Sequence, residues 1–81
     1  MYTLALLLGK RIRQKRKSLG MSQERLAFAC GLDRSYMGRI ERGEVNITVV
    51  SLYQIASALN CSSQELLPKS ATVTLHFSQD D

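Results

Sequence analysis

Apolar residues recur at helical spacing along most of the chain, and residues that favour helix ends punctuate the pattern. Leu4, Leu8 and Ile12 are four residues apart, and the pattern continues with some drift to Leu19. An apolar stripe of this kind predicts a first helix that packs against a core. Gly20 can take the left-handed conformation that ends a helix, so we expect the first helix to stop near residue 18.

Two shorter helices are expected next, each with a side chain that can cap its N-terminus. Ser22 can cap a second helix that ends at Gly31, and Asp33 can cap a third that ends at Gly43. Two helices joined by a tight turn within residues 23–42 have the spacing of a helix-turn-helix. The residues expected on their inner faces are Leu26, Ala27, Cys30, Met37 and Ile40.

The most periodic segment follows a short loop. Thr48 can cap a fourth helix whose apolar residues recur at intervals of three and four until Asn60. Ser62 and Glu65 have the spacing of a capping box, which predicts a short fifth helix that Pro68 ends. We therefore predict an all-α fold in which five short helices form one compact domain.

The C-terminal tail changes period from helical to alternating. Apolar and polar residues alternate there, which predicts a strand at 72–77 within a tail of residues 69–81, after a domain of residues 1–68. The apolar residues are Val73, Leu75 and Phe77. Because five helices supply no second strand, three outcomes are open: pairing with a second copy, addition to another protein's sheet edge, or a frayed tail. We expect pairing across a dimer.

Length and charge narrow the class of protein. A chain of 81 residues with 44% hydrophobic and 22% charged residues fits one globular domain. Its longest apolar run, at residues 4–8, is too short to span a membrane, so we expect a cytoplasmic protein. Residues 1–42 carry ten Lys or Arg against three Asp or Glu (+7), and residues 43–81 carry one against four (−3), which gives the net +4. This asymmetry indicates a polyanionic partner; the alternative is a solvated charged helix.

The sequence offers little for catalysis or metal binding. Cys30, Cys61 and His76 are scattered, so we expect no metal site and interpret both cysteines as buried reduced thiols. There is no glycine-rich phosphate loop, no close Cys/His pair and no carboxylate cluster in the basic half. We therefore expect neither a cofactor nor enzymatic activity.

The third helix carries the candidate chemistry on its exposed side. Its core positions leave Arg34, Ser35, Gly38 and Arg39 exposed. A helix in the major groove reads bases with such residues, and the fork of an Arg side chain matches O6 and N7 of guanine. Glycine inside a helix costs about 1 kcal/mol relative to alanine, so we expect a close approach at Gly38, by DNA or by another helix.

Four segments resemble the Cro/C1-type helix-turn-helix family, also called the XRE family: LGKRIRQKRKSL, MSQERLAFACG, LDRSYMGRIERG and LYQIASAL. The resemblance implies a lambda-repressor-like fold and a transcriptional regulator that binds double-stranded DNA. The short length and the LDRSY and IERG motifs also resemble the controller proteins of restriction–modification systems, which are small dimeric regulators. Controller-like chains usually end soon after the fifth helix, whereas this chain continues through Pro68 to Asp81.

The resemblance also implies roles for individual residues. Contacts to bases are implied for Arg34, Ser35 and Arg39. Contacts to the DNA backbone are implied for Gln23, Tyr36, Arg42 and Asn46, although the ring of Tyr36 could instead pack over the edge of the core. A buried ion pair that ties the first helix to the third is implied for Arg16 and Glu41.

A homodimer on a pseudo-palindromic operator is expected because one short recognition helix spans too few base pairs. The apolar residues that a monomer core needs least are predicted to form the interface: Tyr53, Leu66 and Leu67, together with Val73, Leu75 and Phe77 of the tail. An alternative function is an antitoxin-like protein-interaction module that also binds DNA and holds a protein partner through the tail.

Overall fold

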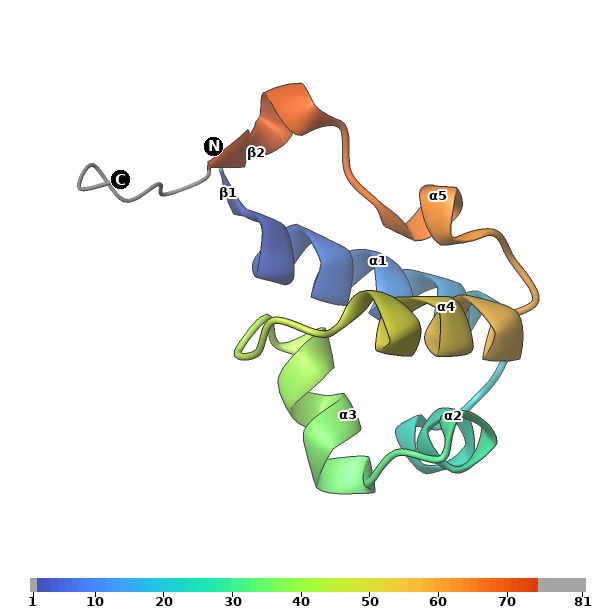
Figure 1. The fold of residues 1–81 in the computed structure, drawn as a ribbon. Helices are drawn as coiled ribbons and strands as arrows, with labels where there is room; N and C mark the ends of the chain where they lie inside the picture. Colours follow the sequence, from blue (N-terminus) through green and yellow to red (C-terminus); the bar gives the residue numbers. More distant parts are fainter. Residues whose placement is uncertain (1, 75–81) are drawn as a thin grey trace.

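A computed structural model describes residues 2–74, and five α-helices follow one another in that part of the chain (Figure 1). The elements are β1 (Tyr2–Thr3), α1 (Leu4–Ser18), α2 (Gln23–Cys30), α3 (Arg34–Glu41), α4 (Val49–Ala58), α5 (Ser63–Leu66), a 3-10 turn (Ser70–Thr72) and β2 (Val73–Thr74). The predicted all-α domain is confirmed. Among residues 2–74, no helix combines the length and the apolar character needed to cross a membrane.

The helix ends are the ones that the capping residues predict. The hydroxyls of Ser22 and Thr48 accept hydrogen bonds from backbone amides three residues later, at 3.0 Å in both cases. The backbone amide of Ser62 donates to the carboxylate of Glu65 at 2.8 Å, as in a capping box. Asn60 follows α4 with a φ of 57°, so local sequence determines this boundary too.

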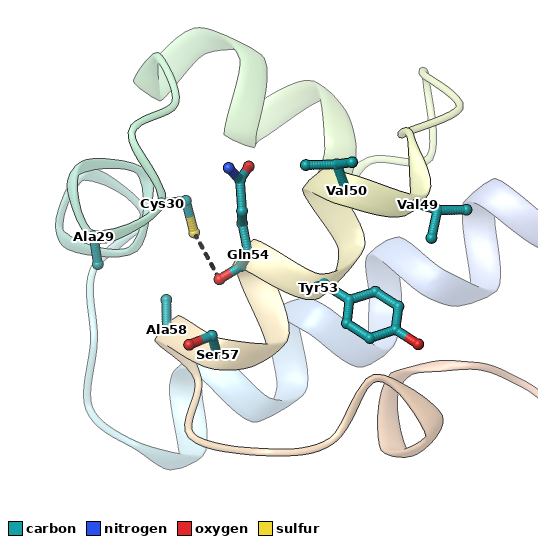
Figure 2. Close-up of a pocket in the computed structure, with 8 residues that line it drawn as sticks. All are labelled: Ala29, Cys30, Val49, Val50, Tyr53, Gln54, Ser57 and Ala58. Atoms are coloured by element: carbon teal, nitrogen blue, oxygen red, sulfur yellow. Dashed lines mark hydrogen bonds between the residues drawn. The ribbon is translucent and has the colours of Figure 1, made fainter.

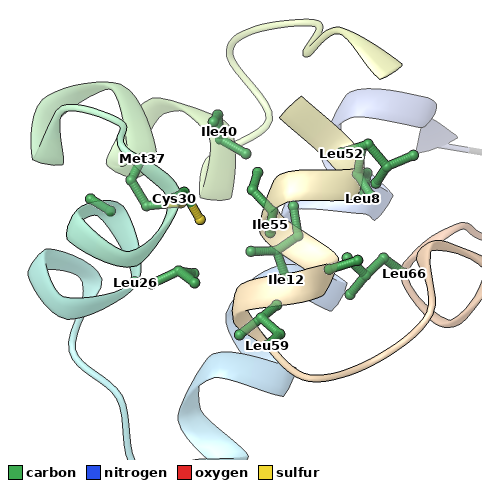
Figure 3. Packing of buried hydrophobic residues seen from close by; sticks show 12 residues of the cluster. Leu8, Ile12, Leu26, Cys30, Met37, Ile40, Leu52, Ile55, Leu59 and Leu66 are labelled. Carbon is green, nitrogen blue, oxygen red and sulfur yellow. The ribbon is translucent and has the colours of Figure 1, made fainter. Parts of the chain in front are cut away.

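One apolar core joins all five helices (Figure 3). Its fully buried side chains are Ile12, Leu26, Met37, Ile40, Ile55, Leu59 and Leu66. The stripe predicted for α1 is wrong at both ends, because Leu4 and Leu19 are exposed. Gly9 and Arg16 are buried on α1 instead. A Cβ at Gly9 would overlap the carbonyl oxygen of Ile40, so glycine is what lets α1 cross α3 this closely.

The tail strand has a partner within the chain, contrary to expectation. β2 pairs with β1 in parallel, with Tyr2 opposite Val73 and Thr3 opposite Thr74 (Figure 1). The predicted strand is confirmed at residues 73–74, while Thr72 belongs to the 3-10 turn. Leu75 and Phe77 lie outside the described residues. The expectation that the strand needs a second protein chain is therefore wrong, because the residues before α1 supply the neighbouring strand.

Candidate nucleic-acid interface

The exposed side of α3 presents the residues expected to read bases. Arg34, Ser35 and Arg39 are exposed, whereas Met37 and Ile40 on the opposite side of the helix are buried in the core. The core residues thus fix how α3 is rotated about its axis. The three polar side chains can contact a ligand without any change in core packing.

A shallow recess brings these side chains together with residues from α2 and from the end of α3. We call it the α3 recess, and its lining residues are Gln23, Arg34, Ser35, Gly38, Arg39 and Arg42. It therefore contains all three residues expected to contact bases and two of the four expected to contact the DNA backbone. The remaining two, Tyr36 and Asn46, lie elsewhere on the surface.

Gly38 forms the floor of the α3 recess and is buried. A Cβ at this position would lie 3.1 Å from Nη1 of Arg42 and 3.6 Å from Oε1 of Gln23. Gln23 belongs to α2, so a side chain of another helix makes part of the close approach expected here. The expectation that Gly38 is exposed is wrong, because these neighbours cover it.

Beneath the α3 recess, a buried ion pair joins α1 to α3. Arg16 Nε donates to Oε2 of Glu41 at 2.6 Å and Arg16 Nη2 donates to Oε1 at 2.9 Å, so the pair is bidentate. Arg16 Nη1 donates to the carbonyl oxygen of Met21 at 2.8 Å. The two charged side chains are 9% and 2% exposed. The structure thus contains the pair that the family resemblance implies.

Gln23 links this ion pair to the surface. Its Nε2 donates to Oε1 of Glu41 at 3.0 Å, and the side chain also lines the α3 recess. Sequence reasoning assigned Gln23 to the DNA backbone and did not find this bond, since the spacing of the two residues gives no sign of it. The bond fixes the direction of the amide, which leaves one Nε2 hydrogen free for a phosphate.

Two residues expected to contact the DNA backbone lie outside the α3 recess. Tyr36 is half-buried and packs against the core, as the alternative interpretation of this residue described. Asn46 is exposed in the loop between α3 and α4. Neither side chain lines the α3 recess, so their contacts with the DNA backbone stay a prediction.

Two exposed carboxylates lie against the arginines of the recess. Arg42 Nε donates to Oε2 of Glu44 at 2.6 Å, and Arg39 Nε lies 3.8 Å from Oε1 of the same residue. Nη1 of Arg34 lies 3.6 Å from Oε2 of Glu24. The hydrogen bond from Arg42 lowers the pKa of the Glu44 carboxyl and raises the pKa of Arg42. Sequence reasoning missed both carboxylates as part of this surface.

A second surface, on α4, is apolar. Val49, Val50 and Tyr53 are 71%, 67% and 62% exposed, and we call them the α4 face. They line a pocket with Ala29 and Cys30 at the end of α2 (Figure 2). Sequence reasoning selected Tyr53 and missed the two valines. The two valines lie off the buried stripe of α4, and this position in the sequence could have predicted that they are exposed.

The other residues expected at a dimer interface differ in how far they are buried. Leu66 is only 1% exposed and belongs to the monomer core, so its assignment to a dimer interface is wrong. This side chain anchors α5 to the core, so it is not available for a contact with a second copy. Leu67 is exposed, and Val73 is half-buried in β2.

The two cysteines are free thiols. Cys30 is buried, its Sγ lies 3.9 Å from the carbonyl oxygen of Gln54, and burial raises the pKa of its thiol. Cys61 is half-buried, and burial and Glu65 raise the pKa of its thiol. Both shifts favour the protonated thiol. The expectation that both cysteines are buried is confirmed for Cys30 and is wrong for Cys61. In the described part of the chain, no three His, Cys, Asp or Glu residues gather as a metal site would require.

Comparisons with known proteins agree with this geometry. The model of the helix-turn-helix family matches residues 12–66. The chain is similar to the control protein C.BamHI of Bacillus amyloliquefaciens, with 43% identity over 65 residues that cover 79% of this chain and 80% of the relative.

Two solved structures have a similar fold and a related sequence. The restriction–modification controller protein C.AhdI from Aeromonas hydrophila superposes with a TM-score of 0.76 and 44% identity, over 78% of this chain and 96% of that protein. The P22 c2 repressor in complex with a synthetic operator superposes with a TM-score of 0.71 and 34% identity, over 75% and 92% of the two chains. All residues that line the α3 recess lie within residues 12–66, the part that the family model matches.

Proposed function

The chain belongs to the helix-turn-helix family of transcriptional regulators, and from this membership we propose that it acts as a homodimer that controls a restriction–modification operon. Proteins of this family regulate transcription and are not enzymes. The prediction that the chain has no enzymatic activity is therefore confirmed. The observation that carries the proposal is the α3 recess, which gathers three arginines on a helix that the core holds in place. From the proposed binding to DNA we also propose a cytoplasmic location.

Base recognition is proposed for the exposed side of α3. Arg34 and Arg39 each offer a planar fork that can donate to both O6 and N7 of a guanine in the major groove. Ser35, in the first turn of the helix, can donate to or accept from a base edge. With their backbone fixed by the buried side of α3, these side chains would read sequence at defined positions.

Contacts to phosphates are proposed for the residues around that helix. Gln23 has a free amide hydrogen, Arg42 a charged fork, and Asn46 and Tyr36 have polar groups outside the recess. Such contacts set the register of α3 on the duplex and carry no sequence information themselves. They would contribute affinity that falls as salt rises.

Dimerisation is proposed through the α4 face, and the exposed Leu67 is a further apolar residue proposed for the interface. A monomer of this size gains by burying exposed valine and tyrosine side chains, and aromatic residues are enriched in interfaces. Two copies related by a twofold axis would present two α3 helices to successive major grooves, about 34 Å apart. The described part of the tail is paired within the chain, so no protein partner is proposed for it.

Selection from a library of random DNA duplexes tests the function. Bound duplexes are recovered over several rounds and sequenced. We expect an inverted repeat whose half-site centres are about one helical turn apart, or a multiple of it. Enrichment of no sequence would contradict sequence-specific binding, and enrichment of a single unrepeated site would contradict the symmetric dimer.

The dimer surface is tested by a pair of charge-matched variants. Tyr53→Glu places a charge in the α4 face, whereas Gln14→Glu adds the same charge on an exposed part of α1. Sedimentation should show a dimer for the wild type and for Gln14→Glu, and a monomer for Tyr53→Glu at the same concentration. A dimer in all three proteins would exclude the α4 face as the interface.

A further inference from the structure

The basic part of the chain, up to residue 44, contains four acidic residues, and two of them have structural tasks. Asp33 caps α3 by accepting the backbone amide of Ser35 at 2.9 Å. Glu41 is buried in its ion pair. The other two, Glu24 and Glu44, are exposed, and both face arginines of the α3 recess.

Together the two carboxylates reach every arginine of the recess. Glu24 contacts Arg34 at 3.6 Å, and Glu44 contacts Arg42 at 2.6 Å and Arg39 at 3.8 Å. Three positive and two negative charges leave this surface with a net charge of only +1. A surface built for phosphate affinity alone would carry no such carboxylates, since they cancel most of its charge.

Folding stability does not account for these pairs. All five side chains are about half exposed or more, and exposed ion pairs contribute little to the stability of a protein. Glu24 and Glu44 also lie on different elements, the first turn of α2 and the loop after α3. What the two carboxylates share is their position beside the arginines.

Phosphates and bases respond differently to such a carboxylate. A phosphate competes for the same guanidinium and is repelled by the carboxylate, so contacts to DNA of any sequence are weakened. A guanine edge is neutral and needs only two of the five N–H donors of an arginine. The donors that a carboxylate leaves free are sufficient for it.

We propose that Glu24 and Glu44 are specificity-determining residues, which restrain the two base-reading arginines, Arg34 and Arg39, from contacts with phosphates of non-operator DNA. The proposal rests on the proposed function, since it assumes that the α3 recess faces DNA. The two carboxylates lower the affinity for all sequences, but they lower it least where guanines meet the arginines. The ratio of operator affinity to nonspecific affinity is therefore higher with them than without them.

The test compares Glu24→Gln and Glu44→Gln with the matched control Glu65→Gln. The control makes the same charge change on exposed α5, and glutamine keeps the capping box of that helix. Dissociation constants are measured over a range of salt concentrations for two probes, the duplex selected from the random library and a scrambled duplex of the same length. Melting midpoints verify that each variant is folded.

For both recess variants we expect affinity for the scrambled duplex to rise by about threefold or more at low salt, beyond the change in Glu65→Gln. The slope of log K against log salt should steepen by about one for each additional phosphate that the arginines neutralise. Affinity for the selected duplex should rise less, so that the specificity ratio falls.

Two results would overturn the proposal. Recess variants that behave like Glu65→Gln would show that the carboxylates act only through net charge. A rise by the same factor on both duplexes would show that they do not affect specificity. A wild-type protein that binds both duplexes equally would contradict the proposed function and this proposal with it, whereas a wild-type specificity ratio that stays unchanged in both variants overturns this proposal alone.

Discussion

Two arginine–glutamate pairs in this protein have the same closest distance and opposite surroundings. Arg16–Glu41 and Arg42–Glu44 each join Nε to Oε2 at 2.6 Å. The side chains of the first pair are 9% and 2% exposed, and those of the second are 59% and 47% exposed. The difference teaches that distance alone does not assign a role to an ion pair, because burial decides whether water or a ligand can replace a partner.

The buried pair holds helices together, whereas the exposed pair borders the surface that we propose for DNA. Removing one partner of the buried pair leaves a charge without solvent or counter-charge, which is costly. Removing one partner of the exposed pair returns the other to water at little cost. Gln23 contacts both regions, since it donates to Glu41 and lines the α3 recess.

The largest expected effect is on the buried side. Glu41→Ala leaves the Arg16 guanidinium buried without its carboxylate and removes the acceptor of Gln23. We expect unfolding free energy to fall by about 3 kcal/mol or more, as measured by urea denaturation. An unchanged denaturation midpoint would show that this pair behaves like an exposed one, which would contradict the claim that burial distinguishes the two pairs.

Arg34→Ala and Gln23→Ala distinguish base reading from backbone contact at the proposed DNA surface. Loss of the Arg34 fork should weaken operator binding by about 1–3 kcal/mol and relax the base preference at one position of each half-site. Gln23→Ala should weaken binding on all sequences, and it should also lower stability because its bond to Glu41 is lost. Binding profiles against a randomised operator distinguish the two, and an unaltered base preference in Arg34→Ala would reject its reading role.

Much of this fold is predictable from the sequence because its signals are local. Ser22, Thr48 and the capping box at Ser62 mark helix starts through bonds three residues long. Left-handed residues such as Asn60 mark helix ends in the same way. Such signals need no knowledge of the tertiary structure, which is why most of the helix boundaries could be expected. The start of α1, where the hydroxyl of Thr3 accepts the backbone amide of Leu6, was missed.

The errors arise where distant segments meet. Pairing of β1 with β2 joins residues about 70 positions apart, and a two-residue strand at the N-terminus has too short a pattern to predict it. Leu66 was assigned to the surface because nothing in α5 shows that this helix turns its leucine into the core. Gly9 has no side chain to mark the crossing of α1 and α3.

The candidate site also has a part that the sequence predicts and a part that depends on the tertiary structure. Exposure of Arg34, Ser35 and Arg39 follows from the buried positions of α3, so it could be predicted from periodicity. Contacts of Glu24 and Glu44 with those arginines depend on how α2, α3 and the following loop are placed in space. No spacing in the sequence encodes that placement.

On the exposed side, Glu44→Gln is expected to leave stability unchanged. The side chain is half exposed and its partner Arg42 returns to water, so nothing buried is left unpaired. Thermal melts of this variant and of Glu41→Ala form a matched pair at the two sites. A large loss in Glu44→Gln would show that the exposed pair has a structural role after all.

The smallest expected effect is a change in the pKa of the Glu44 carboxyl. The hydrogen bond from Arg42 lowers the pKa of the Glu44 carboxyl, so the pair favours the folded state above the pKa of the unfolded chain and loses this as pH falls through the folded pKa. In Arg42→Ala, the midpoint of the Glu44 side-chain carbon shift, followed by NMR, should move to higher pH. An unmoved midpoint would show that Arg42 does not set the pKa of this carboxyl.

Sequence-specific recognition of DNA is the central claim, and one ratio tests it most directly. The dissociation constants of the wild-type protein are measured at physiological salt for the duplex selected from the random library and for a scrambled duplex of equal length. Specific regulators bind their sites about 10³-fold or more tightly than other DNA, and we predict a ratio in that range. A ratio near one would show that this surface binds DNA by charge alone and would contradict the account.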